Sequence, residues 1–471
     1  MITRITKEQT DEMRQYSAKV RMAVNASSCR LGRPLYFHVV TFGCQQNEAD
    51  SERIAGMLSD MGYEKTDILE QADVILVNTC AVREHAEIRA LSVTGQYKHL
   101  KEKNPSLMIG VCGCMVSQEH RIDDIKFRYP YVDFAFGTSY LWRLPSIIYD
   151  RMKKRKRLFL LDTEDDGNIA EDIPVLRECR HRAWLSIMYG CNNFCTYCVV
   201  PHVRGRERSR YKEDILKEAA ELAADGVKDI TLLGQNVNSY GRGLYDDYGF
   251  PELLEDINAI PGDFRIRFMT SHPKDATKKL IDTMARCEKA APQLHLPLQS
   301  GSDRILQRMN RHYTLASYKE LVSYAREKIP GITLTSDIMV GFPGETEEDH
   351  RLTLEALSDI KYDMIFSFIY SKRKNTPAAE YEDQVPEEVK GERFRRMLEL
   401  QNDIGLKINE SYVGKTVFVL CDGVSKNDPG MYAGRTDGGK NICFSGDTAE
   451  GEYIKVKVTS ARPFVLMGER I

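Results

Sequence analysis

Apolar residues in the first third of the chain form short β-rich runs that alternate with segments of helical periodicity. The predicted strands are Tyr36–Thr41, Val74–Thr79, Leu107–Cys112 and Tyr131–Phe136. The stretches with a helical pattern are Ser51–Met61, Glu84–Lys101 and Gln118–Phe127. Strands that alternate with helices predict a parallel, doubly wound α/β sheet.

A second α/β series follows in the middle of the chain. Its predicted strands are Leu185–Met188, Asp229–Gly234, Arg265–Thr270, Gln293–Leu298, Thr333–Val340 and Met364–Tyr370. Helical patterns separate these six strands, and the span contains neither GxGxxG nor GxxxxGK. This organisation predicts a partial (βα)6 barrel rather than a nucleotide-binding Rossmann domain.

The remaining pattern sets the domain organisation. A long charged helix is predicted over 386–410, and the β-patterned, glycine-rich stretch after it predicts a small antiparallel barrel. We therefore expect an N-terminal arm at 1–33, an α/β domain at 34–150, a linker at 151–176, the barrel domain at 177–410 and an all-β domain at 411–471. The arm is polar and is expected to be weakly ordered. The linker opens with the basic run Arg151–Arg157 and continues with the acidic Asp162–Asp166, a pattern typical of a solvated segment.

Composition narrows the class of protein. A length of 471 residues suggests two to four domains, at ~100–200 residues each. The net charge of -3 provides no global attraction for nucleic acid. No apolar run reaches the ~18 residues of a membrane span, and the charged N-terminus lacks a signal core, so we expect a cytoplasmic protein. In that reducing compartment the twelve cysteines favour ligands, catalysts or buried residues over disulfides.

Three of these cysteines lie within eight residues, in CNNFCTYC. Cys191, Cys195 and Cys198 have the spacing CxxxCxxC, and three thiolates so close together suit a soft metal centre. A structural zinc usually takes four protein ligands. A 4Fe–4S cluster held by three cysteines instead keeps one iron free for a small molecule. The alternatives are a zinc knuckle that lacks a ligand and a chance group of buried cysteines.

A second group of three cysteines follows the strands of the first domain. Cys44, Cys80 and Cys114 each come after a predicted strand and lie 36 and 34 residues apart, about one βα unit each. Loops at the carboxyl ends of parallel strands converge on one crevice, so the three thiols can meet in space. The alternative is small buried residues at strand ends. Cys112 points to the same side as Cys114, and we favour Cys114 because it lies further into the loop.

Polar residues gather at the predicted strand ends of the barrel, where the loops of a βα barrel build its site. They occur in Gly234–Asn236, in Thr270–His272, in Gln299–Gly301 and at Asp337. A basic stretch with arginines at 204, 206, 208 and 210 follows the cysteine loop. Its proximity to the predicted metal centre favours contact with phosphate or carboxylate, and the alternative is a solvated loop.

These motifs resemble a known family. CNNFCTYC resembles the cluster loop of radical S-adenosylmethionine enzymes, and the order of the three domains resembles that of the methylthiotransferases, from about Leu35 to Ile471. The stretches that carry the resemblance are TFGCQQNEADSE, NTCAVRE, GCNNFCTYCVVPHVRGRERSR, LLGQNVNSYG, HLPLQSGSDRILQRMNR and DIMVGFPGET. Among the branches of the family, TFGCQQNE and VVPHVRGRERSR are most similar to the branch that modifies tRNA. Gln46 stands where that branch commonly has methionine.

The resemblance implies a fold, two cofactors and a reaction. Cys191, Cys195 and Cys198 would hold a 4Fe–4S cluster that binds S-adenosylmethionine, and Cys44, Cys80 and Cys114 would hold a second, auxiliary 4Fe–4S cluster. The C-terminal domain would be a TRAM-like RNA-binding barrel. The enzyme would use two S-adenosylmethionine molecules to insert sulfur and a methyl group at carbon 2 of isopentenylated adenosine beside the tRNA anticodon.

The resemblance also implies partners and further site residues. The partners would be the tRNA anticodon stem-loop and an external one-electron reductant, for a monomer that does not bind membranes. Tyr197 would pack on the adenine of S-adenosylmethionine, and strand-end side chains would bind its polar groups. These strand-end candidates are Gln235, Ser271, Gln299 and Asp337. No catalytic residue beyond the cluster cysteines is identified.

Two other functions stay open from the sequence. The first is a sister methylthiotransferase that acts on threonylcarbamoyladenosine in tRNA or on a ribosomal protein. The second is a non-catalytic, metal-dependent RNA-binding protein. Colourless protein that carries zinc and does not cleave S-adenosylmethionine would favour the second.

Overall fold

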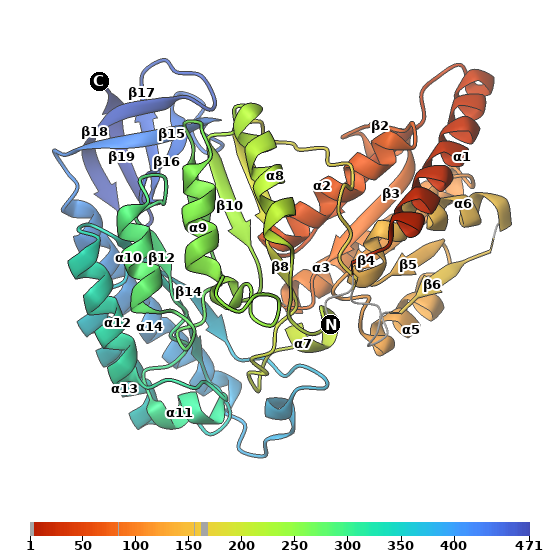
Figure 1. Ribbon diagram of the computed structural model, residues 1–471. Helices are drawn as coiled ribbons and strands as arrows, with labels where there is room; N and C mark the ends of the chain where they lie inside the picture. Colours follow the sequence, from red (N-terminus) through yellow and green to blue (C-terminus); the bar gives the residue numbers. More distant parts are fainter. Residues whose placement is uncertain (1–3, 83, 155, 162–167) are drawn as a thin grey trace. The chain divides into compact units, whose positions relative to one another are not determined.

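The computed structural model describes residues 4–82, 84–154, 156–161 and 168–471 (Figure 1). The chain divides into two compact units. The first unit comprises Met1–Glu178, Met188–Asn192 and Cys198–Arg210, and the second comprises Cys179–Ile187, Asn193–Tyr197 and Tyr211–Ile471. None of the helices in the described part of the chain is long and apolar enough to span a membrane.

The first unit is built on a six-stranded sheet in the order β2-β1-β3-β4-β5-β6, with every pair parallel. The strands are β1 (Tyr36–Thr41), β2 (Glu64–Lys65), β3 (Ala72–Thr79), β4 (Met108–Gly113), β5 (Phe134–Phe136) and β6 (Leu158–Leu160). The helices are α1 (Lys7–Leu31), α2 (Gln45–Asp60), α3 (Glu84–Gln96), α4 (Lys98–Lys103), α5 (Glu119–Arg128) and α6 (Leu144–Lys154). Alternate residues of β3 enter two different apolar cores. One core contains residues of α1, α2 and α6, and the other contains residues of α3 and α5. The predicted doubly wound parallel sheet is confirmed.

The N-terminal arm was expected to be weakly ordered, but most of it is helical. Residues Lys7–Leu31 form a helix of 25 residues. Its start is fixed by a capping box in which Thr6 Oγ1 accepts from the Gln9 amide and the Gln9 side chain accepts from the Thr6 amide. Val20 and Val24 are fully buried in the core of the unit. Apolar residues are sparse along α1, so its stability comes from this packing and leaves only a weak periodic signal.

The expected linker also contains regular structure at its start. Helix α6 extends to Lys154, and Leu158–Leu160 is strand β6 at the edge of the sheet. Arg151 of the basic run donates to the buried carboxylate of Asp133, to which Lys101 also donates. This part of the basic run therefore neutralises a buried acid of the unit. The acidic residues Asp162–Asp166 lie outside the described residues.

The second unit contains six parallel strands with helices between them. They are β7 (Arg182–Ser186), β10 (Asp229–Leu233), β11 (Arg265–Phe268), β12 (Gln293–His295), β13 (Thr333–Val340) and β14 (Met364–Ile369). They pair in chain order as β7-β10-β11 and β12-β13-β14, and a parallel bridge between Ile266 and Ala290 lies between the two sheets. This is the predicted partial (βα)6 barrel.

Helices and short connections complete the barrel domain. The helices are α8 (Lys212–Ala224), α9 (Phe250–Ala259), α10 (Lys278–Arg286), α11 (Asp303–Arg308), α12 (Leu315–Lys328), α13 (Glu347–Ile360) and α14 (Glu387–Glu410). The 3₁₀ turns are η3 (Val237–Ser239) and η4 (Pro377–Glu380) in this unit, and η1 (Leu69–Gln71) and η2 (Thr138–Arg143) in the first. The short β8 (Met188–Tyr189), α7 (Val200–Val203) and β9 (Arg208–Ser209) belong to the first unit.

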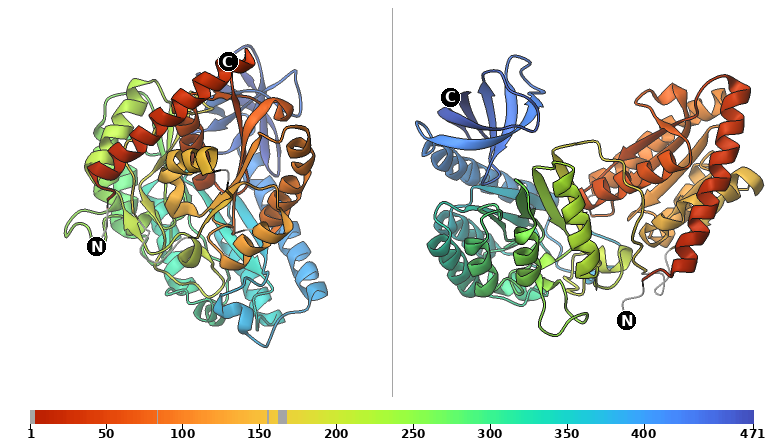
Figure 2. Two further views of the ribbon diagram at one scale, coloured as in Figure 1. Left: turned by 90° about the vertical axis from the view of Figure 1, so that its right-hand side faces the viewer. Right: turned by 45° about the horizontal axis from the view of Figure 1, so that its top comes forward.

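The C-terminal domain is a closed five-stranded barrel that follows α14 (Figure 2). Its strands are β15 (Thr416–Val424), β16 (Tyr432–Thr436), β17 (Asn441–Ser445), β18 (Tyr453–Arg462) and β19 (Val465–Arg470), in the order β15-β16-β17-β19-β18. Inward-facing residues such as Val419, Phe444 and Val456 fill its core. Closure of the barrel confirms the prediction of a small all-β domain and leaves no sheet edge exposed.

Candidate functional site

The sheet of the first unit brings Cys44, Cys80 and Cys114 to one place. They follow β1, β3 and β4, which are adjacent in the sheet, so the three loops leave its carboxyl edge side by side. Cys44 and Cys114 both lie within reach of Asn47 Oδ1, at 3.7 and 3.9 Å from their sulfur atoms. Gly43 adopts φ +130°, and a Cβ on it would lie 2.4 Å from Cys80 Cβ. The absent side chain lets the loop that carries Cys44 pass directly against Cys80.

The ionisation of the three thiols is coupled. A hydrogen bond with Cys80 lowers the pKa of Cys44 to about 6, and the same bond raises the pKa of Cys80. Burial raises the pKa of Cys114 to about 11. Three thiolates cannot coexist at this spacing without a compensating positive charge. A polynuclear cation such as an iron–sulfur centre supplies that charge, so the donor set fits the cluster.

A buried arginine contacts this group. Arg204 is only 5% exposed, and its Nε donates to Cys114 Sγ at 3.0 Å. Its terminal nitrogen Nη2 donates to Asn47 Oδ1 and to Asp50 Oδ2, both at 2.9 Å. Its position in the basic stretch had predicted contact with phosphate or carboxylate of a ligand. In the structure its positive charge lies against a sulfur atom instead.

Cys112 has a different environment from Cys114. It lies in β4, where its side chain is 1% exposed and packs in the apolar core with Leu76 and Phe134. Strand β4 ends at Gly113, and the Cys114 amide then donates to Thr79 O at 3.0 Å. The turn after β4 therefore carries Cys114, and not Cys112, to the loop side of the sheet.

The CxxxCxxC loop lies between β8 and α7 and has no regular secondary structure. Cys191 and Cys198 belong to the first unit and Cys195 to the second. The Cys191 amide donates to Gly205 O at 3.2 Å, which anchors the start of the loop within the first unit. Cys191 and Cys198 are half-buried, whereas Cys195 is buried.

Residues after α11 hold the middle of this loop in the second unit. The Asn310 amide side chain donates to Phe194 O at 3.1 Å, and the Thr196 amide donates to Met309 O at 3.1 Å. The guanidinium of Arg311 is buried, and its Nη1 donates to Cys195 Sγ at 3.4 Å. This arginine has the same relation to Cys195 as Arg204 has to Cys114.

The strand-end candidates line up along successive strands of the barrel. Ser271 is buried and its Oγ donates to Asn238 Oδ1 at 3.3 Å, whereas Gln235, after β10, is half-buried. The Gln299 amide donates to Asp337 O at 2.8 Å, and the Asp337 carboxylate lies 3.5 Å from His295 Nε2. The backbone thus joins Gln299 to Asp337, which lies within β13 rather than at the predicted strand end, while the other two candidates occupy the loops after β10 and β11.

Two features of these loops point to a ligand. Thr270 and Gln299 both adopt positive φ, at +64° and +69°, a strained conformation that non-glycine residues show most often at functional sites. His272 is buried, and its Nε2 has no hydrogen-bond partner among the described residues. Burial lowers the pKa of His272 to about 2, so the ring is neutral. A buried ring nitrogen without a partner suits a polar group of a bound small molecule.

Tyr197 lies in an apolar cluster of the second unit. Its ring packs edge-on against Phe342, with 6.4 Å between the centroids. The cluster also contains Ile305, Met309 and Tyr370. An aromatic ring in such a cluster presents a flat apolar surface, which is what contact with a nucleobase requires.

Sequence reasoning missed several polar residues of these sites. Asn47 and Arg311 both stand in stretches that carry the family resemblance, TFGCQQNEADSE and HLPLQSGSDRILQRMNR, but the pattern did not single out either residue. For Asn47 a further sequence signal was proximity, because it lies three residues after Cys44 at the start of α2. Arg311 lies 116 positions from Cys195, and only the barrel brings the two together.

Comparison with known proteins agrees with the fold and the cysteine pattern. The sequence model described as the Radical SAM superfamily matches residues 185–357. The Uncharacterized protein family UPF0004 matches residues 36–137, and the TRAM domain matches residues 410–471. These three matches cover the three domains in the order that the chain has them.

Relatives are similar over nearly their whole length. A protein of Acetivibrio thermocellus named tRNA-2-methylthio-N(6)-dimethylallyladenosine synthase is 47% identical over 98% of this chain and 97% of its own. Proteins of the same name from Thermoanaerobacter sp. and Clostridioides difficile are 49% and 46% identical, over 93% and 98% of this chain and 93% and 97% of their own.

Among solved structures, the radical S-adenosylmethionine methyltransferase TsrM from Kitasatospora setae matches with a TM-score of 0.53. The match covers 83% of this chain and 79% of that one at 14% identity, which shows a shared fold alone. The sequence matches and the near-complete coverage of the relatives show that the chain belongs to the tRNA-2-methylthio-N(6)-dimethylallyladenosine synthase family of radical S-adenosylmethionine enzymes.

Proposed function

We propose that the chain is a tRNA methylthiotransferase that inserts sulfur and a methyl group at carbon 2 of isopentenylated adenosine beside the anticodon. One observation carries the proposal: a second group of three cysteines meets at the sheet edge of a chain that also has the radical S-adenosylmethionine loop. A generic radical enzyme needs only the loop. The name and near-complete coverage of the relatives support the tRNA nucleoside as the substrate.

The residues fit two 4Fe–4S clusters. Cys191, Cys195 and Cys198 would hold the first, and Cys44, Cys80 and Cys114 would hold the second. When bound, the first cluster supplies the electron that cleaves S-adenosylmethionine, and the second supplies sulfur. Each group has three thiols, and one sulfur of each accepts a hydrogen bond from a buried arginine.

The side chains around the first cluster would bind and orient S-adenosylmethionine. Gln235, Ser271 and Gln299 offer polar groups from the loops after three successive strands, and Asp337 offers a carboxylate from within β13. Tyr197 offers an aromatic surface for adenine. Neutral His272 offers a ring nitrogen that has no hydrogen-bond partner within the described part of the chain. Because these groups lie on a strand or in the loops directly after strands, they would hold the small molecule in one orientation and keep water from the reacting bond.

The partners follow from the same assignment. We propose that the TRAM domain at 411–471 binds the tRNA anticodon stem-loop, together with the α/β domain at 34–150 and the barrel domain at 177–410. Such recognition relies on unstacked bases and aromatic side chains. The enzyme would act as a cytoplasmic monomer that takes its electrons from an external one-electron reductant.

The test uses cysteine variants of the protein purified without oxygen. The wild type should contain about eight iron and eight sulfide per chain, from two four-iron clusters. Cys191→Ala should abolish both S-adenosylmethionine cleavage and methylthiolation. Cys44→Ala should still cleave S-adenosylmethionine but should not methylthiolate tRNA. Cys29→Ala, an exposed cysteine of α1, is the matched control and should retain both activities.

If Cys191→Ala and Cys44→Ala both methylthiolate tRNA at the wild-type rate, the assignment of the two clusters is wrong. The substrate is tested separately, by mass spectrometry of tRNA nucleosides from a strain that lacks the gene. Loss of the methylthio group from isopentenylated adenosine supports the proposal. Its loss from threonylcarbamoyladenosine instead would identify the sister activity.

A further inference from the structure

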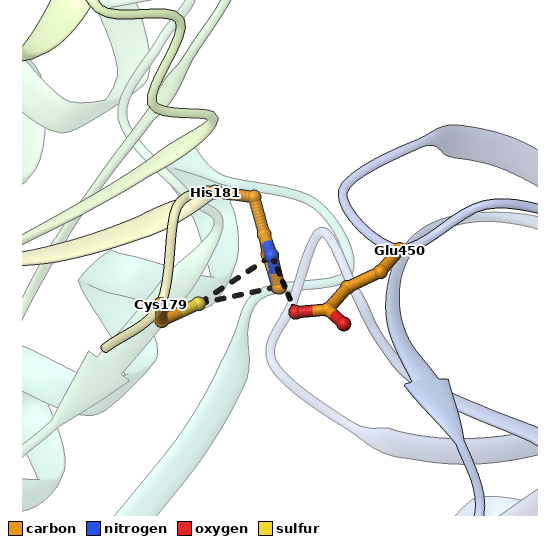
Figure 3. Close-up of side chains that lie close together, drawn as sticks. All are labelled: Cys179, His181 and Glu450. Atoms are coloured by element: carbon orange, nitrogen blue, oxygen red, sulfur yellow. Dashed lines mark hydrogen bonds and ion pairs between the residues drawn. The ribbon is translucent and has the colours of Figure 1, made fainter. Parts of the chain in front are cut away.

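A group of potential metal ligands lies outside both cysteine sites, in the second unit. Cys179 and His181 lie in the segment that leads into β7, and Glu450 lies in the loop between β17 and β18 (Figure 3). One ligand atom from each of the three residues lies within 4.8 Å of the other two. The proposed methylthiolation uses none of them.

Two of the three separations among these atoms match a tetrahedral metal site. Cys179 Sγ lies 3.4 Å from His181 Nδ1, and that nitrogen lies 3.4 Å from Glu450 Oε1. Zinc bonds of ~2.3 Å to sulfur and ~2.0–2.1 Å to nitrogen and oxygen, at tetrahedral angles, separate sulfur from nitrogen by ~3.6 Å and nitrogen from oxygen by ~3.4 Å. The Glu450 side chain is 60% exposed, so it has room to rotate toward the sulfur.

A second carboxylate orients the imidazole. His181 Nε2 lies 3.4 Å from Asp422 Oδ1 on β15, and the histidine side chain is only 7% exposed. A histidine that binds a metal through one ring nitrogen typically donates the other N–H to a carboxylate. Arg182 and Arg435 lie 3.5 and 3.6 Å from Asp422 and hold that carboxylate in place. The other ring nitrogen, Nδ1, lies near both Cys179 Sγ and Glu450 Oε1.

The loop between β17 and β18 passes close to His181. Gly451 adopts φ +82°, and a Cβ on it would lie 2.9 Å from His181 Cβ. Its amide donates to Cys421 O at 2.9 Å, which fixes the loop on β15. The loop thus passes against His181 without a side chain between them, and its neighbour Glu450 is brought to the thiol and imidazole.

We propose that Cys179, His181 and Glu450 form a binding site for a single divalent zinc-class metal ion. Thiolate and imidazole ligands select zinc over magnesium or calcium, and one thiol cannot hold an iron–sulfur cluster. Three protein ligands leave the fourth tetrahedral position to water. Because two ligands precede the first barrel strand and the third belongs to the C-terminal domain, the ion ties the TRAM domain to the barrel domain.

The test measures zinc in the full-length, cluster-loaded protein after dialysis against buffered zinc. We expect about one zinc per chain in addition to the iron of the clusters. Cys179→Ser and His181→Ala should lose this zinc and keep their iron. Asp422→Asn should bind zinc 10–100-fold more weakly. Cys443→Ser, a half-buried cysteine of β17, is the matched control and should keep the zinc.

Cobalt substitution provides a readout that does not depend on stoichiometry. Wild-type protein whose zinc is exchanged for cobalt should gain a thiolate-to-cobalt absorption band, and Cys179→Ser should lack it. The proposal is overturned if the wild type binds no zinc at micromolar free metal, or if Cys179→Ser retains it. Zinc held adventitiously in empty cluster sites would persist in Cys179→Ser, and would therefore also count against the proposal. These results are independent of methylthiolation activity.

Discussion

At the scale of residues, two buried arginines face the sulfur atoms of the two cysteine groups. Arg204 donates to Cys114 and Arg311 donates to Cys195. A cluster ligated by thiolates becomes more negative when it is reduced. Hydrogen bonds and positive charge at the sulfur atoms therefore stabilise the reduced state.

Replacement of Arg204 tests this effect. Arg204→Gln removes a buried positive charge next to Cys114 and leaves Asp50 without its cationic partner. Both changes disfavour the reduced state, so we expect a more negative reduction potential of the auxiliary cluster, measured by redox titration followed by electron paramagnetic resonance. Arg206→Gln changes an exposed arginine two positions away and should leave the potential unchanged. Equal potentials in all three proteins would contradict the assigned contact.

His350 should make stability depend on pH. Its side chain is fully buried in α13, and burial lowers its pKa to about 4 from an ordinary value of 6.5. The unfolded chain therefore takes up a proton between pH 6.5 and pH 4 that the folded chain does not. Stability from this residue is present above pH 6.5 and is lost as the pH falls, by about 1.4 kcal/mol between pH 7.5 and 5.5.

The measurement compares the wild type with His350→Gln by anaerobic denaturation at pH 7.5 and 5.5. Glutamine does not titrate, so the variant should lose about 1.4 kcal/mol less than the wild type over this range, whatever its stability at pH 7.5. Parallel losses in the two proteins would show that the folded histidine is already protonated at pH 5.5.

At the scale of elements, two helix glycines have opposite surroundings. Gly56 in α2 is buried, and a Cβ on it would lie 2.2 Å from Pro174 O. Gly391 in α14 is exposed, and a Cβ on it would meet no atom within 4 Å outside its own helix turn. Leu176, next along the same segment, donates its amide to Glu52 O at 2.9 Å. Close contact between α2 and the 174–176 segment therefore requires glycine at position 56.

The same substitution should have opposite effects at these two positions. Gly391→Ala should stabilise the protein by about 0.5–1 kcal/mol, because alanine loses less conformational entropy in a helix. Gly56→Ala should destabilise it by about 1–3 kcal/mol, because the backbone of Pro174 must move away. Thermal melting without oxygen measures both, and a stabilised Gly56→Ala protein would refute the contact.

At the scale of the molecule, one arginine joins the barrel domain to the TRAM domain within the second unit. Arg267 on β11 is buried, and its Nε donates to Asp229 Oδ2 at 2.6 Å. Its remaining nitrogens donate to Asp437 O at 2.8 Å and Thr436 O at 3.2 Å, both in the C-terminal barrel. The two domains therefore share a buried, charged contact.

Loss of this contact should cost far more than loss of a surface ion pair. Arg267→Met removes the ion-pair partner of the buried Asp229 carboxylate and should destabilise the protein by about 3–5 kcal/mol. Arg265→Met, on the same strand, removes a half-exposed pair with Asp437 and should cost about 0–1 kcal/mol. Thermal melting measures the loss of stability in both variants. Similar losses would mean that the Arg267 ion pair stabilises the protein no more than a surface ion pair does.

Much of the fold was predictable, because apolar periodicity reports local structure directly. Strands Tyr36–Thr41 and Thr333–Val340 have the predicted bounds. Strand β12 was predicted to reach Leu298 but ends at His295, because the Leu298 amide donates to the Ser336 side chain instead of the backbone of β13. Pairing resumes at a single bridge between Gln299 and Ile338, one residue out of register. Helix α1 and strand β6 escaped prediction because their stability depends on distant parts of the chain.

The sequence by itself determined the α/β class, the order of the three domains and the two cysteine groups. It did so because strand–helix alternation and CxxxCxxC are local patterns. Only the tertiary structure decided which groups complete each site. Arg204 meets Cys114 across 90 positions, and His181 meets Asp422 across 241. Such contacts arise from strand order and loop closure, which no local pattern encodes, and they supply the buried charges on which the chemistry of the cysteines depends.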